Sequence, residues 1–458
     1  MSRAAEFTGA RDASAPLTWT QHQTWKNLQL FEPQHTNVGW YQPLPVGLTM
    51  GDLCQAVGQV MGAFEALRTR YALDAAGSPR QTVDMRGRVA MDTCASSDAL
   101  AESDARKVLS GFIGRGFEHE RDLPVRFAAV LVDEAPVYLV VAASHLSLDG
   151  FACGLVKEAL DESVSRTRPE GPAAPRLQPV DRARLESSPD GALQNNTSLA
   201  YWKRTLETCP AANFPKADQG GTGTRWSRSV MRSPALEQAA GLLAATHKVS
   251  PSAVLQAGVS ALVGALSGNE NCVFSEVVSN RASIADKTYV GDLAQGAVVL
   301  VRTTGTTFAE LVRDTWLARI TAYANSRYHP LELDDLWADV ERVRGEKILL
   351  DCLYNDMATT QQAGPSLAES ELRAMVGETT VRSEPISVDT DAKLSLHLYG
   401  TPGGVDFAMR VDPDYVAGPG PERFLRALES LLVEEVESPG RHRPIQRVAE
   451  LAEGSAAA

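Results

Sequence analysis

A proline-rich stretch is the feature that most restricts how this 458-residue chain can fold. Residues 166–191 contain five prolines and many charges, but few large apolar side chains. Proline removes a backbone donor and disfavours helix interiors and central strands, so we predict a linker over 166–191. The linker separates an N-terminal lobe at 16–165 from a C-terminal lobe at 192–450, and we expect a loose leader at 1–15 and a loose tail at 451–458.

Both lobes mix the patterns of helices and strands. Apolar residues recur at helical spacing from Leu53 to Leu67 behind the capping residue Thr49, and the pair Ser250-Pro251 is typical of a second helix start. Apolar runs at 125–132 and 137–143 predict two strands joined by a turn, and 272–278 predicts another strand. The chain is therefore predicted to be a mixed α/β (α+β) protein with two lobes.

Composition excludes several classes of protein. A hydrophobic content of 44% is too high for a disordered chain, and 57 acidic against 44 basic residues give a net charge of −13. That charge disfavours nucleic acid and anionic membrane surfaces as partners. We find no apolar stretch long enough to span a membrane and no secretory signal, so we expect a cytoplasmic protein. The six cysteines lack the spacing of zinc sites or disulfide frameworks, and we expect no metal.

The segment Ser144–Gly150 directly follows the second predicted strand and precedes a predicted helix. His145 stands at the strand end, where an imidazole is held rigidly and can accept a proton from a nucleophile or hold it by a hydrogen bond. Asp149 is expected to pair with a cation that fixes the loop, and Gly150 to let the backbone turn and leave space beside it. Taken alone, the H-x-x-x-D-G pattern favours a structural histidine over a catalytic one.

Several segments together resemble the condensation domains of nonribosomal peptide synthetases, within the superfamily shaped like chloramphenicol acetyltransferase. The family motif is HHxxxDG, and Ser144–Gly150 matches it except that Ser144 replaces the first His. The resemblance extends over most of the chain. The other similar segments are Pro16–Thr18 with Gln21, Glu65–Thr69, Phe117-Glu118 with Leu123–Arg126, Tyr201-Trp202, Val277–Arg281 and Tyr354-Asn355.

The resemblance implies two chloramphenicol acetyltransferase-like lobes that form a V with a tunnel at their interface. It implies that His145 acts at the reaction centre, where it accepts the acceptor's proton or stabilises the tetrahedral intermediate. Asp149 would form a structural ion pair with Arg281 from the other lobe, and the backbone of Gly150 would lie beside the reacting groups. The family's first His is chiefly structural, so Ser144 does not by itself predict inactivity.

Three further residues are candidates for the substrate channel. Tyr354 and Asn355 match a family segment that would line the acceptor channel. His397 alternates with apolar residues in Leu394–Leu398, so it is a candidate for facing the tunnel.

The resemblance implies a condensation enzyme of natural-product biosynthesis. It would join an acyl or aminoacyl thioester on a carrier protein to an amine or hydroxyl acceptor, which yields an amide or an ester. It would bind no cofactor of its own, because the thioester is carried on the phosphopantetheine arm of the partner. No adenylation or carrier segment adjoins the unit, so we expect a free-standing enzyme that meets acyl or peptidyl carrier proteins in trans.

Three alternatives remain open. A catalytically degenerate relative would bind carrier proteins or recruit a tailoring enzyme, and Ser144 favours this reading. An epimerase would need a second acid or base, for which Glu276 is a candidate. A coenzyme A-dependent acyltransferase would need a D-F-G-W-G motif, and the nearest string is Asp406–Met409.

Overall fold

The computed structural model describes residues 3–165, 172–174, 177–214, 227–358, 369–386, 392–401, 403–416 and 420–440. The chain divides into two compact units. The first contains Met1–Asn196, Ser279–Gln295 and Arg327–Asp334, and the second contains Thr197–Val278, Gly296–Ser326 and Asp335–Ala458. The first unit thus includes three segments that the sequence-based division assigned to the C-terminal lobe, which are residues 192–196, 279–295 and 327–334.

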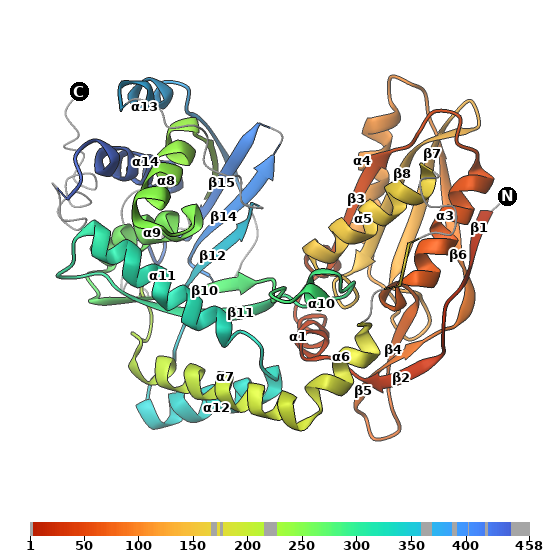
Figure 1. Ribbon diagram of the computed structural model, residues 1–458, viewed down its shortest axis with the longest axis horizontal. Helices are drawn as coiled ribbons and strands as arrows, with labels where there is room; N and C mark the ends of the chain where they lie inside the picture. The colour runs from red at the N-terminus through yellow and green to blue at the C-terminus, as the bar shows by residue number, and fades with distance from the viewer. Residues whose placement is uncertain are drawn as a thin grey trace. The chain divides into compact units, whose positions relative to one another are not determined.

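The first unit is built on a five-stranded sheet with the order β1-β6-β7-β8-β3 and a three-stranded sheet with the order β2-β5-β4 (Figure 1). Its strands are β1 (Arg3–Thr8), β2 (Ala13–Pro16), β3 (Asn37–Pro43), β4 (Thr69–Leu73), β5 (Pro79–Val83), β6 (Arg86–Ala95), β7 (Val125–Val132) and β8 (Ala135–Ser144). Its helices are α1 (Trp19–Asn27), α2 (Pro33–Thr36), α3 (Met50–Ala63), the 3₁₀ helix η1 (Glu65–Arg68), α4 (Ala101–Ile113), α5 (Gly150–Val164), α6 (Pro179–Glu186) and α10 (Ile284–Lys287).

The hairpin of β7 and β8 is buried on both faces of the larger sheet. Phe127 and Val141 pack with α3 and α5, whereas Val130 and Val140 face α4. Because both faces are buried, both strands consist of nearly continuous apolar residues. These apolar runs are the pattern from which the sequence predicted the two strands. The turn places Asp133 at φ 48° and Glu134 at φ 66°, a geometry that suits the twist of a two-residue hairpin.

Two expectations about flexible segments are wrong where the structure describes them. The leader forms β1, which pairs with β6, because Ala5 and Phe7 alternate into the core. The second half of the expected linker forms α6 and the start of α7 (Pro189–Thr208), since Pro179 and Pro189 stand at the first helical position, where no backbone donor is needed. Residues 166–171, 175–176 and the expected tail at 451–458 lie outside the described residues.

The second unit is built on a seven-stranded sheet with the order β11-β10-β12-β14-β15-β9-β13. Its strands are β9 (Ser227–Arg232), β10 (Asn271–Val278), β11 (Gln295–Arg302), β12 (Cys352–Met357), β13 (Thr380–Pro385), β14 (Leu394–Thr401) and β15 (Gly404–Val411). Its helices, grouped with α7, are α8 (Pro234–His247), α9 (Pro251–Ser267), α11 (Phe308–Ala324), α12 (Pro330–Arg344), α13 (Glu369–Val376) and α14 (Pro421–Glu437).

Local expectations for individual elements are confirmed. Thr49 caps α3 and Ser250 caps α9, and each side chain accepts a backbone N–H from the first turn of its helix. The predicted strand at 125–132 matches β7, and the one at 272–278 differs from β10 by a single residue. These features depend on adjacent residues, which explains why the sequence predicted them.

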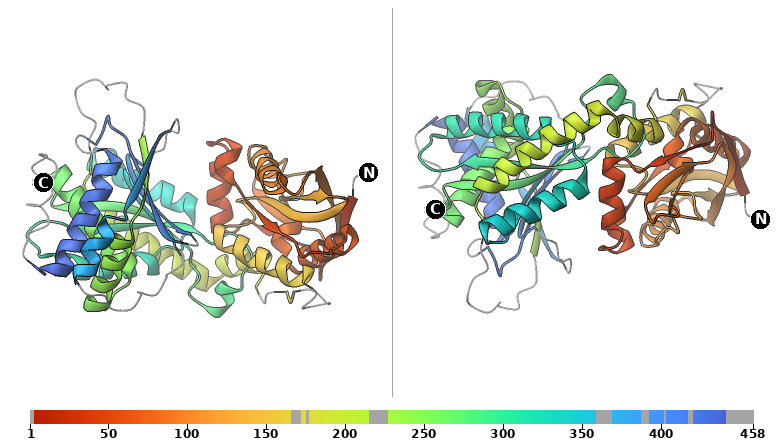
Figure 2. Two further views of the ribbon diagram at one scale, coloured as in Figure 1. Left: turned by 90° about the horizontal axis from the view of Figure 1, so that it is seen from above. Right: turned by 90° about the horizontal axis from the view of Figure 1, so that it is seen from below.

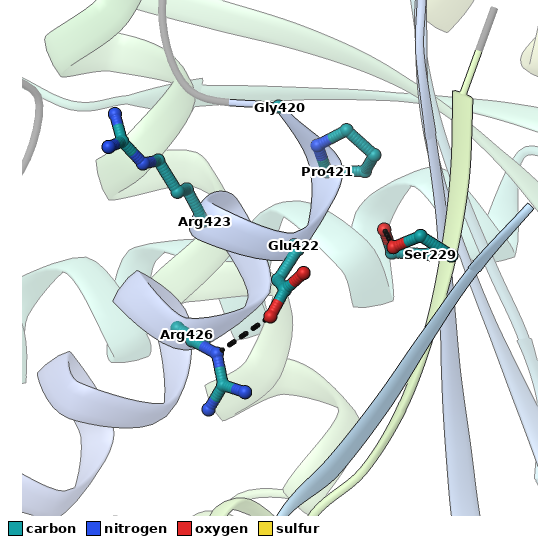
Figure 3. A pocket seen from close by; sticks show the side chains of 7 residues that line it. Ser229, Gly420, Pro421, Glu422, Arg423 and Arg426 are labelled. Atoms are coloured by element: carbon teal, nitrogen blue, oxygen red, sulfur yellow. Dashed lines mark hydrogen bonds and ion pairs between the residues drawn. The ribbon is translucent and has the colours of Figure 1, made fainter.

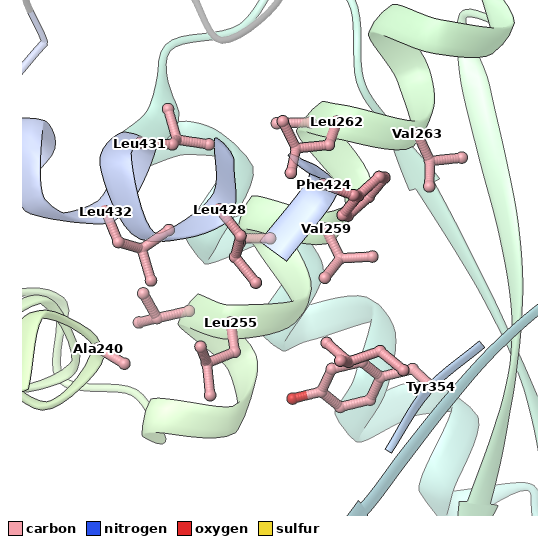
Figure 4. Close-up of a cluster of buried hydrophobic side chains, with 14 of the residues drawn as sticks. Ala240, Leu255, Val259, Leu262, Val263, Tyr354, Phe424, Leu428, Leu431 and Leu432 are labelled. Atoms are coloured by element: carbon pink, nitrogen blue, oxygen red, sulfur yellow. The ribbon is translucent and has the colours of Figure 1, made fainter. Parts of the chain in front are cut away.

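Helix α9 is the centre of the core of the second unit. Figures 1 and 2 show it grouped with α8 and α14, with which it is in contact. Its residues Val259 and Leu262 pack with Leu428 of α14 in the cluster shown in Figure 4.

Among the described residues no single helix has the length and apolar character needed to cross a membrane. Helices α8 and α9 reach that length and apolar character only when counted as a pair, and they are bent by 105° relative to each other.

Candidate active site

The loop from Ser144 to Asp149 joins β8 to α5 and carries the motif. Its start is held because the backbone N–H of His145 donates to the carbonyl of Thr36 at 2.8 Å. Its end is held because the Asp149 carboxylate caps α5 and accepts the N–H of Ala152 at 2.7 Å. Both ends of the loop are tied to regular structure, which positions His145 between them.

A buried ion pair joins Asp149 to Arg281. Nη2 of Arg281 lies 2.7 and 2.8 Å from the two carboxylate oxygens, and both side chains are almost fully buried. Burial raises the pKa of the Asp149 carboxyl, whereas the guanidinium and two backbone N–H groups oppose that shift by stabilising the carboxylate. Loss of one partner would leave the other charged and buried, so this pair holds the loop in place.

Arg281 also organises the segment to which it belongs. Its guanidinium donates to the backbone carbonyls of Asp286, Tyr289 and Gly291 at 2.7–3.0 Å. The family resemblance implied a partner from the other lobe, but Arg281 lies in the first unit together with Asp149. The reason is that residues 279–295 leave the second unit after β10 and pack with the first unit before β11 begins.

The imidazole of His145 lies beside the carboxylate of Asp292. Its Nδ1 is 3.6 Å from Oδ2 of Asp292, and the His145 side chain keeps 35% of its surface exposed while that of Asp292 keeps 2%. Burial lowers the pKa of His145, but the Asp292 carboxylate outweighs this effect and raises the pKa to about 9. The ring is therefore mainly imidazolium at neutral pH, a form that stabilises developing negative charge.

Ser144, the residue that replaces the first motif His, is hydrogen-bonded to another histidine. Its Oγ lies 2.8 Å from Nε2 of His119, and the residue is fully buried. Burial lowers the pKa of His119 to about 4, so its ring is neutral at physiological pH and can accept a hydrogen bond from the Ser144 hydroxyl. The imidazole of His119, which is 25 residues away in the sequence, thus lies next to position 144.

Gly150 is the first residue of α5, and its side-chain position is open. Its φ lies outside the left-handed region, so the turn of the backbone that we expected at Gly150 does not depend on glycine. A Cβ at this position would meet no described atom within 4 Å. The open space agrees with the other half of the expectation, which was that Gly150 leaves room beside the motif.

The three channel candidates lie in the second unit. Tyr354 on β12 is 1% exposed, and its hydroxyl donates to the carbonyl of Ser252 at 3.0 Å, so it is a core residue (Figure 4). Asn355 lies opposite His397 on the neighbouring strand β14, with 3.5 Å between Nδ2 and Nδ1. Both are half-buried, and burial lowers the pKa of His397 to about 4. The structure therefore brings Asn355 and His397 together and separates them from the interior position of Tyr354.

A surface pocket of about 360 Å³ lies at the start of α14 (Figure 3). It is lined by Ser229, Ser383, Gly420, Pro421, Glu422, Arg423 and Arg426. The two serine hydroxyls bond to each other at 2.7 Å, and Glu422 pairs with Arg426 at 3.1 Å. Much of the polar lining is thus already satisfied, and no residue predicted for the site takes part.

Metal and thiol chemistry find no support at the motif. Within the part of the chain that the structure describes, no three His, Cys, Asp or Glu side chains converge as a metal ion requires. Cys153 lies one helical turn beyond Asp149, but burial raises the pKa of its thiol to about 12, which disfavours a thiolate nucleophile.

Sequence reasoning missed Asp292 and His119. Each lies beside the motif only because distant segments fold against it, so no local spacing points to either residue. An acidic residue within the mostly apolar stretch 289–301 was the available signal for Asp292. For His119, the missing His at position 144 was a reason to search for a histidine elsewhere.

The condensation-domain family model matches residues 12–389, so this chain belongs to the condensation-domain family of nonribosomal peptide synthesis and related biosynthesis. The isonitrile lipopeptide synthase of Mycobacterium tuberculosis is 28% identical over 69% of this chain. The chain spans only 13% of the length of that synthase.

Solved structures of condensation domains share the fold. The first condensation domain of the calcium-dependent antibiotic synthetase, in complex with a substrate analogue, has a TM-score of 0.67 at 19% identity, covering 94% of this chain and 98% of its own. The X-domain in complex with OxyB from teicoplanin biosynthesis has a TM-score of 0.68 at 16% identity, covering 97% of both chains. The expected mixed α/β, chloramphenicol acetyltransferase-like fold is thereby confirmed.

Proposed function

We propose that this chain transfers an acyl or aminoacyl group from a carrier-protein thioester to an amine or hydroxyl acceptor. The observation that carries the proposal is the partly exposed imidazole of His145, held at the end of β8 beside the buried Asp292. The ion pair of Asp149 with Arg281 and the open space at Gly150 support it, because they give a rigid loop with room for a reacting group. Membership of the condensation-domain family agrees with this chemistry.

In the proposed reaction the acceptor nitrogen or oxygen attacks the thioester carbonyl and forms a tetrahedral intermediate. The C–S bond then breaks, the amide or ester forms, and the phosphopantetheine thiol leaves with the proton that the acceptor loses. His145 as imidazolium donates a hydrogen bond to the charge that develops in this intermediate. No change of oxidation state occurs, so no redox cofactor is needed, and approximation of the two substrates supplies much of the rate.

The implied partners follow from the same chemistry. The donor is held by the phosphopantetheine arm of an acyl or peptidyl carrier protein, and the acceptor is a second carrier-bound amine or a small amine or alcohol. Carrier proteins are usually acidic, so we expect them to dock at local basic patches in spite of the net charge of −13.

The test compares the wild type with His145→Ala on carriers loaded with a panel of aminoacyl and acyl thioesters and supplied with mixed amines and alcohols. Mass spectrometry follows the product. We expect transfer to fall by about 10²–10³-fold in His145→Ala, as for loss of a single hydrogen-bond donor to the charge that develops in the intermediate. The matched control is His247→Ala at the end of α8 in the second unit, which should transfer as the wild type does. Equal transfer by His145→Ala and the wild type, well above background, would contradict the proposal.

A second function is favoured by one specific observation, the serine at position 144. In this alternative the fold holds a carrier protein or recruits another enzyme without catalysis, and the similarity to the X-domain structure agrees with it at the level of the fold. Background-level transfer in both wild type and His145→Ala, together with measurable carrier binding, would support this function instead.

A further inference from the structure

Asp292 is a buried carboxylate with an unusual set of neighbours. Its side chain is 2% exposed, Oδ2 accepts the hydroxyl of Thr24 at 3.0 Å, and Oδ1 accepts the backbone N–H of Ala294 at 3.2 Å. The hydroxyl of Thr20 donates to the Asp292 carbonyl at 2.7 Å, so α1 holds both the side chain and the backbone of this residue. These neutral donors fix the carboxylate but leave its charge unbalanced.

His145 is the side chain that balances this charge. Among the described residues no Lys or Arg nitrogen lies within 4 Å of the Asp292 carboxylate, and the only group with a cationic form at that range is the imidazole of His145. A buried carboxylate without a cation is costly, so the arrangement favours a proton on the facing ring nitrogen, Nδ1. Nε2 is then the nitrogen left for the reacting groups.

We propose that Asp292 is a positioning residue for His145, whose carboxylate keeps Nδ1 protonated, orients Nε2 toward the reacting groups and stabilises the imidazolium. The inference rests on the proposed function for its catalytic consequence, but its effect on His145 itself is independent of any substrate. Asp292 lies outside the H-x-x-x-D-G motif. Through Asp292, helix α1 and residues 279–295 help to position the side chain at the reaction centre.

The groups that face His145 agree with this assignment. Asp292 raises the pKa of His145 to about 9 against burial, and Asp149 contributes in the same direction but is neutralised by Arg281. The nearby phenol of Tyr71 is buried and has a raised pKa, so it remains uncharged through the same range. Asp292 is therefore the one unbalanced negative charge that acts on His145 among the groups that the structure describes.

The experiment measures the pKa of His145 by NMR titration of ¹³C/¹⁵N-histidine-labelled protein, with the His145 signals assigned by their loss in His145→Gln. The wild type should titrate well above the ordinary value of about 6.5, and Asp292→Asn should return the pKa of His145 toward that value. The matched control is Asp161→Asn, which removes a half-exposed carboxylate of α5 about 16 Å along the helix axis from Gly150. It should leave the pKa of His145 unchanged.

Activity provides a second readout with a defined sign. In Asp292→Asn the ring loses its proton between about pH 5 and about pH 8, because its pKa is then ordinary or lower, whereas the wild-type ring stays protonated over this range. The loss of kcat/KM in Asp292→Asn should therefore grow by about tenfold or more between these two pH values. Asp292→Glu keeps a carboxylate and should retain more of the wild-type kcat/KM at the higher pH. A merely structural role predicts a loss that does not depend on pH.

The outcomes separate this inference from the proposed function. If the wild-type His145 titrates at or below about 6.5, or if its pKa does not move in Asp292→Asn, the inference is overturned whatever the activity. If the pKa moves as expected but no carrier-bound substrate is transferred, the inference stands and the proposed function fails. If Asp292→Asn does not fold, the wild-type titration decides alone.

Discussion

Each unit of this protein buries an ion pair, but the two pairs have very different surroundings. In the first unit Asp149 and Arg281 are next to the partly exposed His145 and to the open side of Gly150. In the second unit Glu276 pairs with Arg319 at 3.1 Å, accepts the hydroxyl of Tyr323 and remains inside the core.

The difference teaches that a buried ion pair does not by itself mark a reaction centre. Burial raises the pKa of Glu276, and Arg319 and Tyr323 stabilise its ionised form, but both charged side chains are nearly inaccessible. Glu276 was the candidate second acid or base for an epimerase, and its position inside this network disfavours that reading. What distinguishes the first unit is a titratable side chain that remains accessible beside the pair.

The largest expected effect tests what the two pairs have in common, which is that each stabilises its own unit. Arg281→Ala and Arg319→Ala should each lose about 3–5 kcal/mol of folding stability, because each leaves a buried carboxylate without its cation. Chemical denaturation measures the loss, and hydrogen exchange shows which unit it affects.

Replacement of both partners by apolar residues sharpens the comparison. Glu276→Leu with Arg319→Met should recover much of the lost stability and keep transfer activity, since well-packed apolar pairs often substitute for buried ion pairs. Asp149→Leu with Arg281→Met should recover stability less well and lose transfer, because Asp149 also caps α5. Equal transfer by the two double variants would contradict the distinction.

A smaller effect is expected where His119 meets Ser144. His119→Ala removes the imidazole that is bonded to the buried Ser144 hydroxyl, leaves that hydroxyl only the longer bond from the Leu146 N–H at 3.3 Å, and should cost about 1–3 kcal/mol. Ser144→His alone should also destabilise, since position 144 is fully buried and a larger ring needs the space of its neighbour. The double change Ser144→His with His119→Ser should be more stable than the sum of the two single effects predicts. Thermal unfolding of the four proteins checks this, and additive effects would show that the two residues are independent.

The smallest effect on stability is expected at Gly150. Gly150→Ala adds a methyl group where no described atom lies within 4 Å, so stability should change by less than about 1 kcal/mol while transfer falls if substrate occupies that space. Gly258→Ala in α9 is the opposite case, because its Cβ would lie 2.5 Å from Cδ1 of Leu428, and it should cost about 1–3 kcal/mol without touching the motif. Unfolding curves and initial rates of both variants test the contrast.

The sequence predicted the elements that depend on neighbouring residues. The apolar runs of β7 and β8, the caps Thr49 and Ser250, and the position of His145 between a strand and a helix follow from local patterns. The expected linker failed over α6 for a local reason too, because a proline at a helix start was read as a helix breaker. The ion pair of Asp149 with Arg281 was expected from the family resemblance, not from any pattern in the chain.

Contacts between distant segments decided the rest. The sequence by itself determined the family, the mixed α/β class and the motif loop, because each is encoded in short runs of adjacent residues. Only the tertiary structure placed Arg281 in the same unit as Asp149, Asp292 beside His145 and His119 beside Ser144. The physical reason is that charge balance and burial act between side chains that folding brings together, and no periodicity along the chain records such pairs.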